Sequence, residues 1–137
     1  MRNARTTSVM LAALLLAALL LACRPKLMDE ETRAYASSVI FSNVRLSALE
    51  TYAHQTVHYL HIDVQNRGQR RVKHLEVILY FRNSLGQVAL TERAVAISPR
   101  LRPLEPGETR KFQQGFDPPA GWNRTSPNIG IAHLVIE

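Results

Sequence analysis

Cysteine is almost absent from this chain, whose 137 residues include one. A single cysteine cannot form an internal disulfide, and it excludes a zinc finger built from paired cysteines. The sequence also has no Gly-x-Ser-x-Gly nucleophile elbow and no glycine-rich phosphate loop. The usual signatures of thiol redox enzymes, α/β-hydrolases and nucleotide-binding proteins are therefore missing. We predict a non-enzymatic protein with no catalytic residue, no metal ligand and no cofactor.

Long apolar runs are also scarce, with one exception at the N-terminus. Residues 1–8 carry two arginines and no acid, and residues 9–21 are then apolar without a break. A membrane-spanning helix needs about 20 such residues, so this run is too short to span a bilayer. A positive segment followed by a short apolar one is typical of a secretory signal peptide. Removal of residues 1–22 would lower the net charge from +6 to +4.

The apolar run ends in Leu20-Leu21-Ala22-Cys23, which resembles the lipobox of bacterial lipoproteins. A lipobox has Leu three positions before the cysteine, a small residue directly before it, and cleavage in front of it. The resemblance implies that residues 1–22 are a signal peptide and that Cys23 is the lipid attachment site, with palmitate-type acyl chains. Two or three acyl chains hold a protein firmly on a membrane, because each buried methylene contributes about 0.8 kcal/mol. The alternative is an ordinary secreted protein with a coincidental cysteine.

Arg24 follows the expected lipid attachment site. In enteric bacteria an Asp there retains lipoproteins at the inner membrane, so Arg predicts the outer membrane, with the domain facing the periplasm. Residues 23–34 are polar, mixed in charge and contain a proline, and they predict a tether with one helical turn near Asp29–Ala34. Such a tether reaches at most about 35–40 Å, so we expect the folded domain close to the membrane surface.

Residues 35–137 are predicted to form one domain, in which apolar residues recur with a period of two. The strand-like segments, separated by turn signals, are 39–46, 56–66, 72–82, 88–97 (one strand or two), 109–116 and 128–136. Asn66–Gln69 is predicted to be a hairpin turn, and Pro106-Gly107 suits a type II turn. Six or seven short strands without a long helix predict an all-β fold, an antiparallel immunoglobulin-like β-sandwich.

Part of this region resembles the FxLYD-type immunoglobulin-like domains of bacterial envelope proteins. The matching features are Val64-Gln65-Asn66 at a strand end, the aromatic pair Tyr80-Phe81, the turn Asn83–Gly86, the segment Leu104–Thr109 and Phe112. An Asp usually follows the aromatic pair, where this chain has Arg82-Asn83. The resemblance spans about half of the mature chain, and it implies an interaction or scaffold module.

One basic cluster and the single tryptophan are the candidate partner contacts. Arg67, Arg70 and Arg71, with Lys73, surround the first predicted turn, and Trp122 lies in a loop rich in Pro, Gly and Asn. Guanidinium groups bind phosphates and carboxylates, and Trp and Arg are typical interface hot spots. The alternatives are a solvated turn that blocks edge pairing and a tryptophan that caps the core. An exported lipoprotein does not meet nucleic acid, so the expected partners are the membrane, through the lipid, and another envelope protein.

Three histidines, His54, His58 and His61, would share one face of a helix and could there bind zinc or copper. The β-forming residues around them predict a strand instead, on which His58 and His61 point to opposite faces. His74 would lie near His61 only if their two strands formed a hairpin. A metal site is therefore not predicted.

The predicted function is that of a lipid-anchored envelope protein acting as a non-catalytic binding or assembly module. The alternatives are a periplasmic small-ligand or metal-binding carrier and a hydrolase with an unrecognised site. Paired carboxylates for a hydrolase would have to come from Asp63, Glu76, Glu92, Glu105, Glu108 and Asp117.

Overall fold

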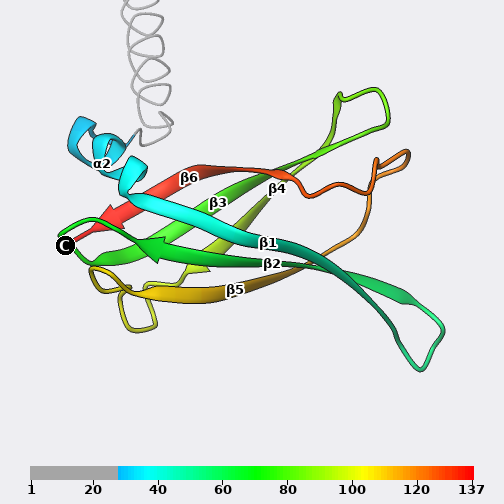
Figure 1. The fold of residues 1–137 in the computed structure, drawn as a ribbon, viewed down its shortest axis with the longest axis horizontal. Coiled ribbons are helices and arrows are strands. Elements are labelled where there is room, and N and C mark those ends of the chain that lie inside the picture. The colour runs from blue at the N-terminus through cyan, green and yellow to red at the C-terminus, as the bar shows by residue number, and fades with distance from the viewer. Residues whose placement is uncertain (1–27) are drawn as a thin grey trace, which may run out of the picture.

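The computed structural model describes residues 28–137, which form an all-β sandwich (Figure 1). Six strands follow a short helix and a 3-10 turn: α2 (Glu30–Tyr35), Ala36–Ser38, β1 (Val39–Glu50), β2 (Thr56–Asn66), β3 (Val72–Arg82), β4 (Val88–Ile97), β5 (Thr109–Phe116) and β6 (Asn128–Ile136). One antiparallel sheet has the order β1-β2-β5 and the other the order β4-β3-β6. The predicted antiparallel β-sandwich is confirmed. Five of the strands have the predicted bounds, and β1 continues to Glu50, four residues beyond its predicted end at 46.

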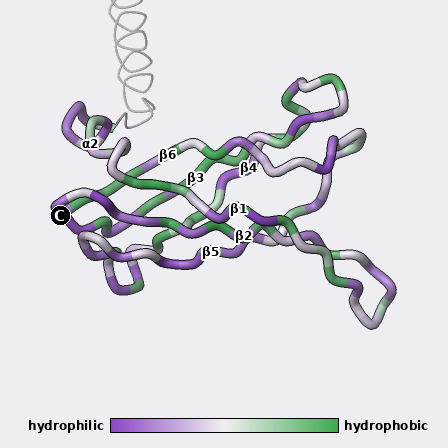
Figure 2. The backbone as a smooth tube through the Cα atoms, in the orientation of Figure 1, coloured by the Kyte–Doolittle hydropathy of each residue, from purple (hydrophilic) through white to green (hydrophobic). Residues whose placement is uncertain are grey.

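The core lies between the central strands of the two sheets, β2 and β3. Leu60, Ile62 and Val64 of β2 are at most 1% exposed. On β3, Leu75 and Phe81 are 0% exposed, and the residues between them alternate between the core and the outer face. Figure 2 shows hydrophobic and hydrophilic residues alternating along the strands. Each buried Leu, Ile or Phe contributes about 1.5–3 kcal/mol, so this alternation determines which face of each sheet is buried.

The connection from β2 to β3 is not the predicted hairpin. β2 pairs with β1 and β5 while β3 pairs with β4 and β6, so residues 67–71 cross from one sheet to the other. The first residue of β3, Val72, instead exchanges two backbone hydrogen bonds with Leu104 in the β4–β5 connection. A turn signal indicates that the chain changes direction, but not which strand the next segment pairs with. Here β2 and β3 are the central strands of two different sheets, and their apolar faces are buried against each other.

Helix α2 lies directly before the sandwich, where one helical turn was predicted. Asp29 caps it, because its Oδ1 accepts a 2.7 Å hydrogen bond from the Thr32 backbone N–H. Thr32 is buried, and Met28 and Tyr35 pack against the core. Residues 28–34, which the sequence assigns to the tether, are therefore packed on the domain. None of the helices among residues 28–137 is long and apolar enough to cross a bilayer.

The sandwich has two ends, which carry different segments (Figure 1). We define the proximal end by α2, residues 66–71, residues 98–108 and the C-terminus. We define the distal end by the β1–β2 hairpin tip (51–55), the β3–β4 turn (83–87) and the loop 117–127. Met28, the first described residue, packs at the proximal end, and the distal end is the opposite end of the sandwich.

Candidate functional site

The predicted partner contacts do not form one surface. Arg67, Arg70 and Arg71 lie at the proximal end, whereas Trp122 lies in the loop of the distal end. Cys23, the expected lipid attachment site, is outside the described residues 28–137. The basic cluster and the tryptophan must therefore be considered separately.

The basic cluster is paired with acids of the same end. Arg70 forms an ion pair with Glu31 of α2, and Arg71 Nη2 lies 2.9 Å from Oε1 of Glu137. Lys73 Nζ lies 3.5 Å from the other oxygen of Glu137. Exposed pairs of this kind contribute at most about 1 kcal/mol each to stability. The two acids offset two of the four positive charges. Arg67 forms no ion pair among residues 28–137, and its Nε donates to Gln65 Oε1 at 2.8 Å, so the cluster keeps a net positive charge.

Asn66, the last residue of the Val-x-Asn motif, is fully buried and joins three segments of the proximal end. Its Nδ2 donates to the carbonyls of Arg70 at 2.7 Å and Leu104 at 3.1 Å. Its Oδ1 accepts from the Tyr35 hydroxyl at 2.8 Å and from the Gly68 backbone N–H at 3.1 Å. Position 68 must be glycine, because a Cβ there would collide with the Tyr35 hydroxyl. The motif therefore serves the fold.

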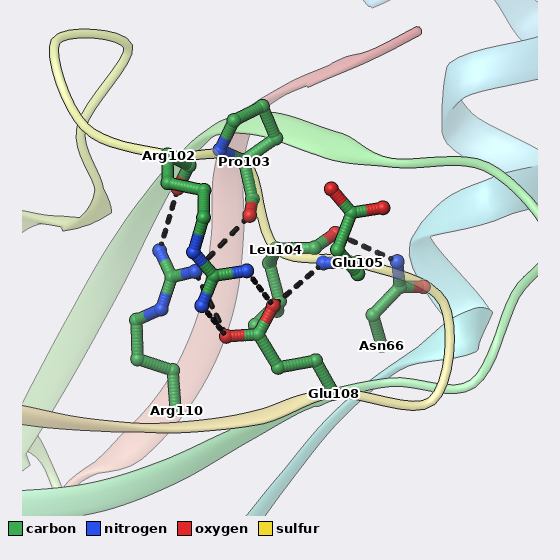
Figure 3. Close-up of polar contacts among 7 residues, drawn as sticks. All are labelled: Asn66, Arg102, Pro103, Leu104, Glu105, Glu108 and Arg110. Atoms are coloured by element: carbon green, nitrogen blue, oxygen red, sulfur yellow. Dashed lines mark hydrogen bonds and ion pairs between the residues drawn. The ribbon is translucent and has the colours of Figure 1, made fainter.

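Glu108, from the Leu-x-Pro-Gly-Glu-Thr segment, organises the neighbouring turn (Figure 3). Its carboxylate accepts from Arg102 at 2.7 and 3.0 Å, from the Glu105 backbone N–H at 2.8 Å and from Arg110 at 2.9 Å. Burial alone would raise the pKa of Glu108, but these bonds and the charge of Arg110 outweigh it and lower the pKa to about 2. The predicted type II turn is present, since Gly107 has φ +79° and Glu108 N–H donates to the Glu105 carbonyl.

The distal end of the core is closed by a cluster of aromatic rings. The ring centroids of Phe81 and Phe116 are 4.6 Å apart, and Trp122 meets Phe116 edge-on at 5.5 Å. His58 completes the cluster, 5.8 Å from both Phe116 and Trp122. Edge-to-face aromatic pairs add about 0.5–1.5 kcal/mol beyond the area that they bury. Trp122 therefore caps the core, which was the alternative to a purely exposed contact.

The loop that carries Trp122 is fixed to the β3–β4 turn. The Ser84 N–H donates to the Gly121 carbonyl at 3.2 Å, and the Asn123 N–H donates to the Arg82 carbonyl at 3.0 Å. The loop thus has a defined position over the end of the sandwich. It can form one wall of a stable cleft.

That cleft has a volume of about 590 Å³, within the range of ligand sites. It is lined by Leu46, Ser47, Ala48, His58, Pro118, Pro119, Gly121, Trp122 and Arg124. No Asp or Glu is among these residues. The guanidinium of Arg124 is exposed and has no hydrogen bond or ion pair with any residue from 28 to 137. The cleft therefore combines an apolar wall with one free positive charge.

Beside the cleft, the β1–β2 hairpin carries exposed apolar side chains toward its tip. The last four residues of β1, 47–50, are all exposed. Leu49 is 60% exposed and Tyr52 at the tip is completely exposed. Exposed large apolar side chains next to a cleft are typical of interaction surfaces.

The carboxylates that the sequence offers for hydrolysis are mostly dispersed. Glu92 and Asp117 are the pair that shares a depression, of about 450 Å³, between β4 and the end of β5. Burial, with a contribution from the charge of Asp117, raises the pKa of Glu92. Glu108 is instead committed to Arg102 and Arg110.

The three histidines near the β1–β2 hairpin do not converge. His58 faces the core side, whereas His61 Nε2 lies 2.8 Å from the Ser47 hydroxyl, and His54 Nδ1 lies 3.0 Å from Glu50 in the tip. The possible neighbour of His61, His74, is on the other sheet, because β2 and β3 do not form a hairpin.

His74 lies instead beside His133 of β6, with ring centroids 5.5 Å apart. The Nδ1 atom of His74 is buried without a hydrogen-bond partner among residues 28–137. Nowhere in this part of the chain do three or more metal-binding side chains come together.

No family model matches the chain, and no curated protein or solved structure matches it either. The sequence pointed to Trp122 but not to Arg124, Leu46 and Ala48, which complete the cleft. Alternation marks Leu46 and Ala48 as ordinary strand residues, and only the position of the loop 117–127 makes them the wall of a cleft.

Proposed function

We propose that this protein is a lipid-anchored component of the bacterial envelope, in the outer membrane and facing the periplasm, whose sandwich is a non-catalytic binding module. In this proposal Cys23 carries the lipid and the distal end binds another envelope protein. The lipid confines the domain to a thin layer next to the membrane and so raises its effective concentration for partners there.

The opposite location of the two ends supports this proposal (Figure 1). Four residues separate Cys23 from Met28, the first described residue, so the Cα atoms of these two residues are at most about 17 Å apart. A lipid on Cys23 would therefore hold the proximal end next to the membrane. The distal end, with its cleft and the exposed Leu49 and Tyr52, would face away from the membrane toward partners.

Two experiments test the two parts of the proposal. Replacement of Cys23 by Ala should move the protein from the membrane fraction to the soluble fraction, or stop removal of the signal peptide. Membrane partitioning equal to that of the wild type, together with normal removal of the signal peptide, would refute the lipid anchor.

The distal surface is tested with a photo-activated crosslinking residue placed at Ser47 or Tyr52 in living cells. We expect a discrete crosslinked product with one envelope protein from both positions. The same probe at Arg100, an exposed residue of the proximal connection, should not give this product. Equal products from all three positions, or none from Ser47 and Tyr52, would contradict the proposal.

A further inference from the structure

We propose that the free edge of β1 next to the distal cleft binds an extended peptide segment of the partner, as an added strand, and that Arg124 binds a carboxylate of that peptide. This inference rests on the proposed function, because it specifies how the distal end would recognise its partner. Strand addition is an established mode of peptide recognition, in which backbone hydrogen bonds provide affinity and side-chain pockets provide specificity.

The edge of β1 is available for such pairing. β1 is the outer strand of its sheet, and no strand among residues 28–137 pairs with its other edge. In an antiparallel pair, alternate residues of an edge strand direct their N–H and C=O groups away from the sheet. β1 has 12 residues, so its unpaired groups form a row about 40 Å long.

The two halves of β1 differ in how well they are protected. Natural edge strands are usually blocked by bulges, prolines or charges. The register shifts between Ser42 and Arg45, where Asn43 has φ +50°, so the first half carries a bulge and a charge. From Leu46 to Glu50 the pairing with β2 is regular, with no proline and a charge only at the last residue. The unblocked half of the edge is the half beside the cleft.

The cleft has the right position to receive side chains of an added strand. Leu46 and Ala48 pair with Leu60 and His58 of β2, which point toward the core side, and both line the cleft. Side chains alternate between the two faces of a strand, so every second side chain of a bound peptide would point into the cleft. There it would meet the ring of Trp122 and the neighbouring prolines.

The charge of the cleft selects the kind of peptide. Arg124 has no partner among residues 28–137, and no acid lines the cleft. A guanidinium binds a carboxylate with two parallel hydrogen bonds. We therefore expect alternating apolar residues and one carboxylate, from an Asp, a Glu or the peptide C-terminus.

A second copy of the chain fits this edge poorly. Antiparallel pairing of two β1 strands would place their proximal ends about 40 Å apart, at opposite ends of the pair. Both proximal ends could lie next to one membrane, within reach of the four residues between Cys23 and Met28, only if the paired strands ran along its surface. The distal ends would then not face away from the membrane, as the proposed function requires. The occupant is therefore a segment of a different protein.

The test uses the full-length lipidated protein in detergent micelles and a displayed library of random peptides as long as β1, with free C-termini. We expect the selected peptides to share alternating apolar residues and an acidic group. Their binding should slow hydrogen exchange of the backbone amides in residues 46–50. Protection of another strand edge, or selection of no peptide, would overturn the inference.

The charge is tested with Arg124→Asn, which removes the guanidinium but suits the φ of +60° at this position. This variant should bind the selected peptide about tenfold more weakly, as expected for loss of one charge-assisted pair. Arg100→Asn, at an exposed proximal arginine without an ion pair, is the matched control and should bind like the wild type. Equal binding by all three proteins would overturn the inference, as would a dimer of the chain joined through β1. If these peptide tests fail but the distal crosslinks still form in cells, the proposed binding module stands and only this mode of recognition is wrong.

Discussion

The side-chain amide of Asn66 donates a hydrogen bond of 3.1 Å to the carbonyl of Leu104, 38 residues further along the chain. This contact joins the end of β2 to the connection between β4 and β5. The sequence predicted only a hairpin turn at Asn66 and no contact with residues so far along the chain. It explains why a polar residue occupies a fully buried position at the end of an apolar strand.

Replacement of Asn66 by Ala should lower the free energy of unfolding by about 2–4 kcal/mol, since it removes two buried hydrogen bonds, to the Arg70 and Leu104 carbonyls, and the acceptor of the Tyr35 hydroxyl and the Gly68 N–H. Urea denaturation would measure this. Asn128→Ala is the control, because Asn128 is exposed and accepts one bond from Arg82, and it should change stability by at most about 0.5 kcal/mol. Equal effects of the two substitutions would show that the buried network does not stabilise the fold.

The low pKa of Glu108 predicts how stability depends on pH. The pKa of the folded state, about 2, lies below the ordinary value of 4.5. The stabilisation by the ionised carboxylate is therefore complete above pH 4.5 and is lost as the pH falls toward 2. Glu108→Gln should lower stability at pH 7 by about 1–2 kcal/mol, allowing for its partial exposure, and should weaken the loss of stability in that window.

The neighbouring residue provides the control for Glu108. The Glu105 side chain forms no ion pair among residues 28–137, so Glu105→Gln should leave both stability and its pH dependence close to those of the wild type. Urea titrations of all three proteins between pH 2 and 7 make the comparison. An unchanged pH profile in Glu108→Gln would contradict the role assigned to this carboxylate.

Glu92 should show the opposite behaviour. Because burial and Asp117 raise its pKa, the folded state favours the protonated acid, and stability should decline as the pH rises through the raised pKa. Glu92→Gln should therefore increase stability at pH 7, by about 0.5 kcal/mol, with no gain at pH 3, where the carboxyl of the wild type is already neutral. A loss of stability at pH 7 would show that the ionised carboxylate has a favourable partner.

Trp122 should matter for stability as well as for the cleft. Trp122→Ala removes the ring that contacts Phe116 and His58, and we expect a loss of about 2–4 kcal/mol in thermal or urea unfolding. Tyr52→Ala is the matched control, because this aromatic residue is fully exposed, and its effect should be within about 0.5 kcal/mol. An unchanged stability of Trp122→Ala would mean that the ring does not cap the core.

The strands could be predicted from the sequence because a strand with one buried face shows alternating apolar and polar residues, whichever strand it pairs with. The inner face of β2 is visible in the alternation of Leu60, Ile62 and Val64 with polar residues. Pairing between strands could not be predicted in the same way. The apolar faces of β2 and β3 suit a hairpin and two facing sheets equally well, and contacts distant in sequence, such as Val72 with Leu104, decide between them.

The candidate contacts were predictable as residue types but not as a surface. The cluster around Arg70 is conspicuous as a run of basic residues, yet its acid, Glu31, is 39 residues away in the sequence. Arg124 is an isolated arginine in the sequence and gains its interest only from the cleft in which it lies. Ion pairing and cleft formation both depend on distances that a linear pattern does not contain.

The most direct test of the central claim compares the distal crosslink in two forms of the protein. The probe at Ser47 is used in the wild-type chain and in Cys23→Ala, with both proteins exported to the periplasm at equal levels and with the signal peptide removed from both. If the lipid confines a binding module next to its partner, the wild-type chain should give at least about tenfold more of the crosslinked product. Equal yields from the two proteins would contradict the claim that membrane anchoring and binding at the distal end act together.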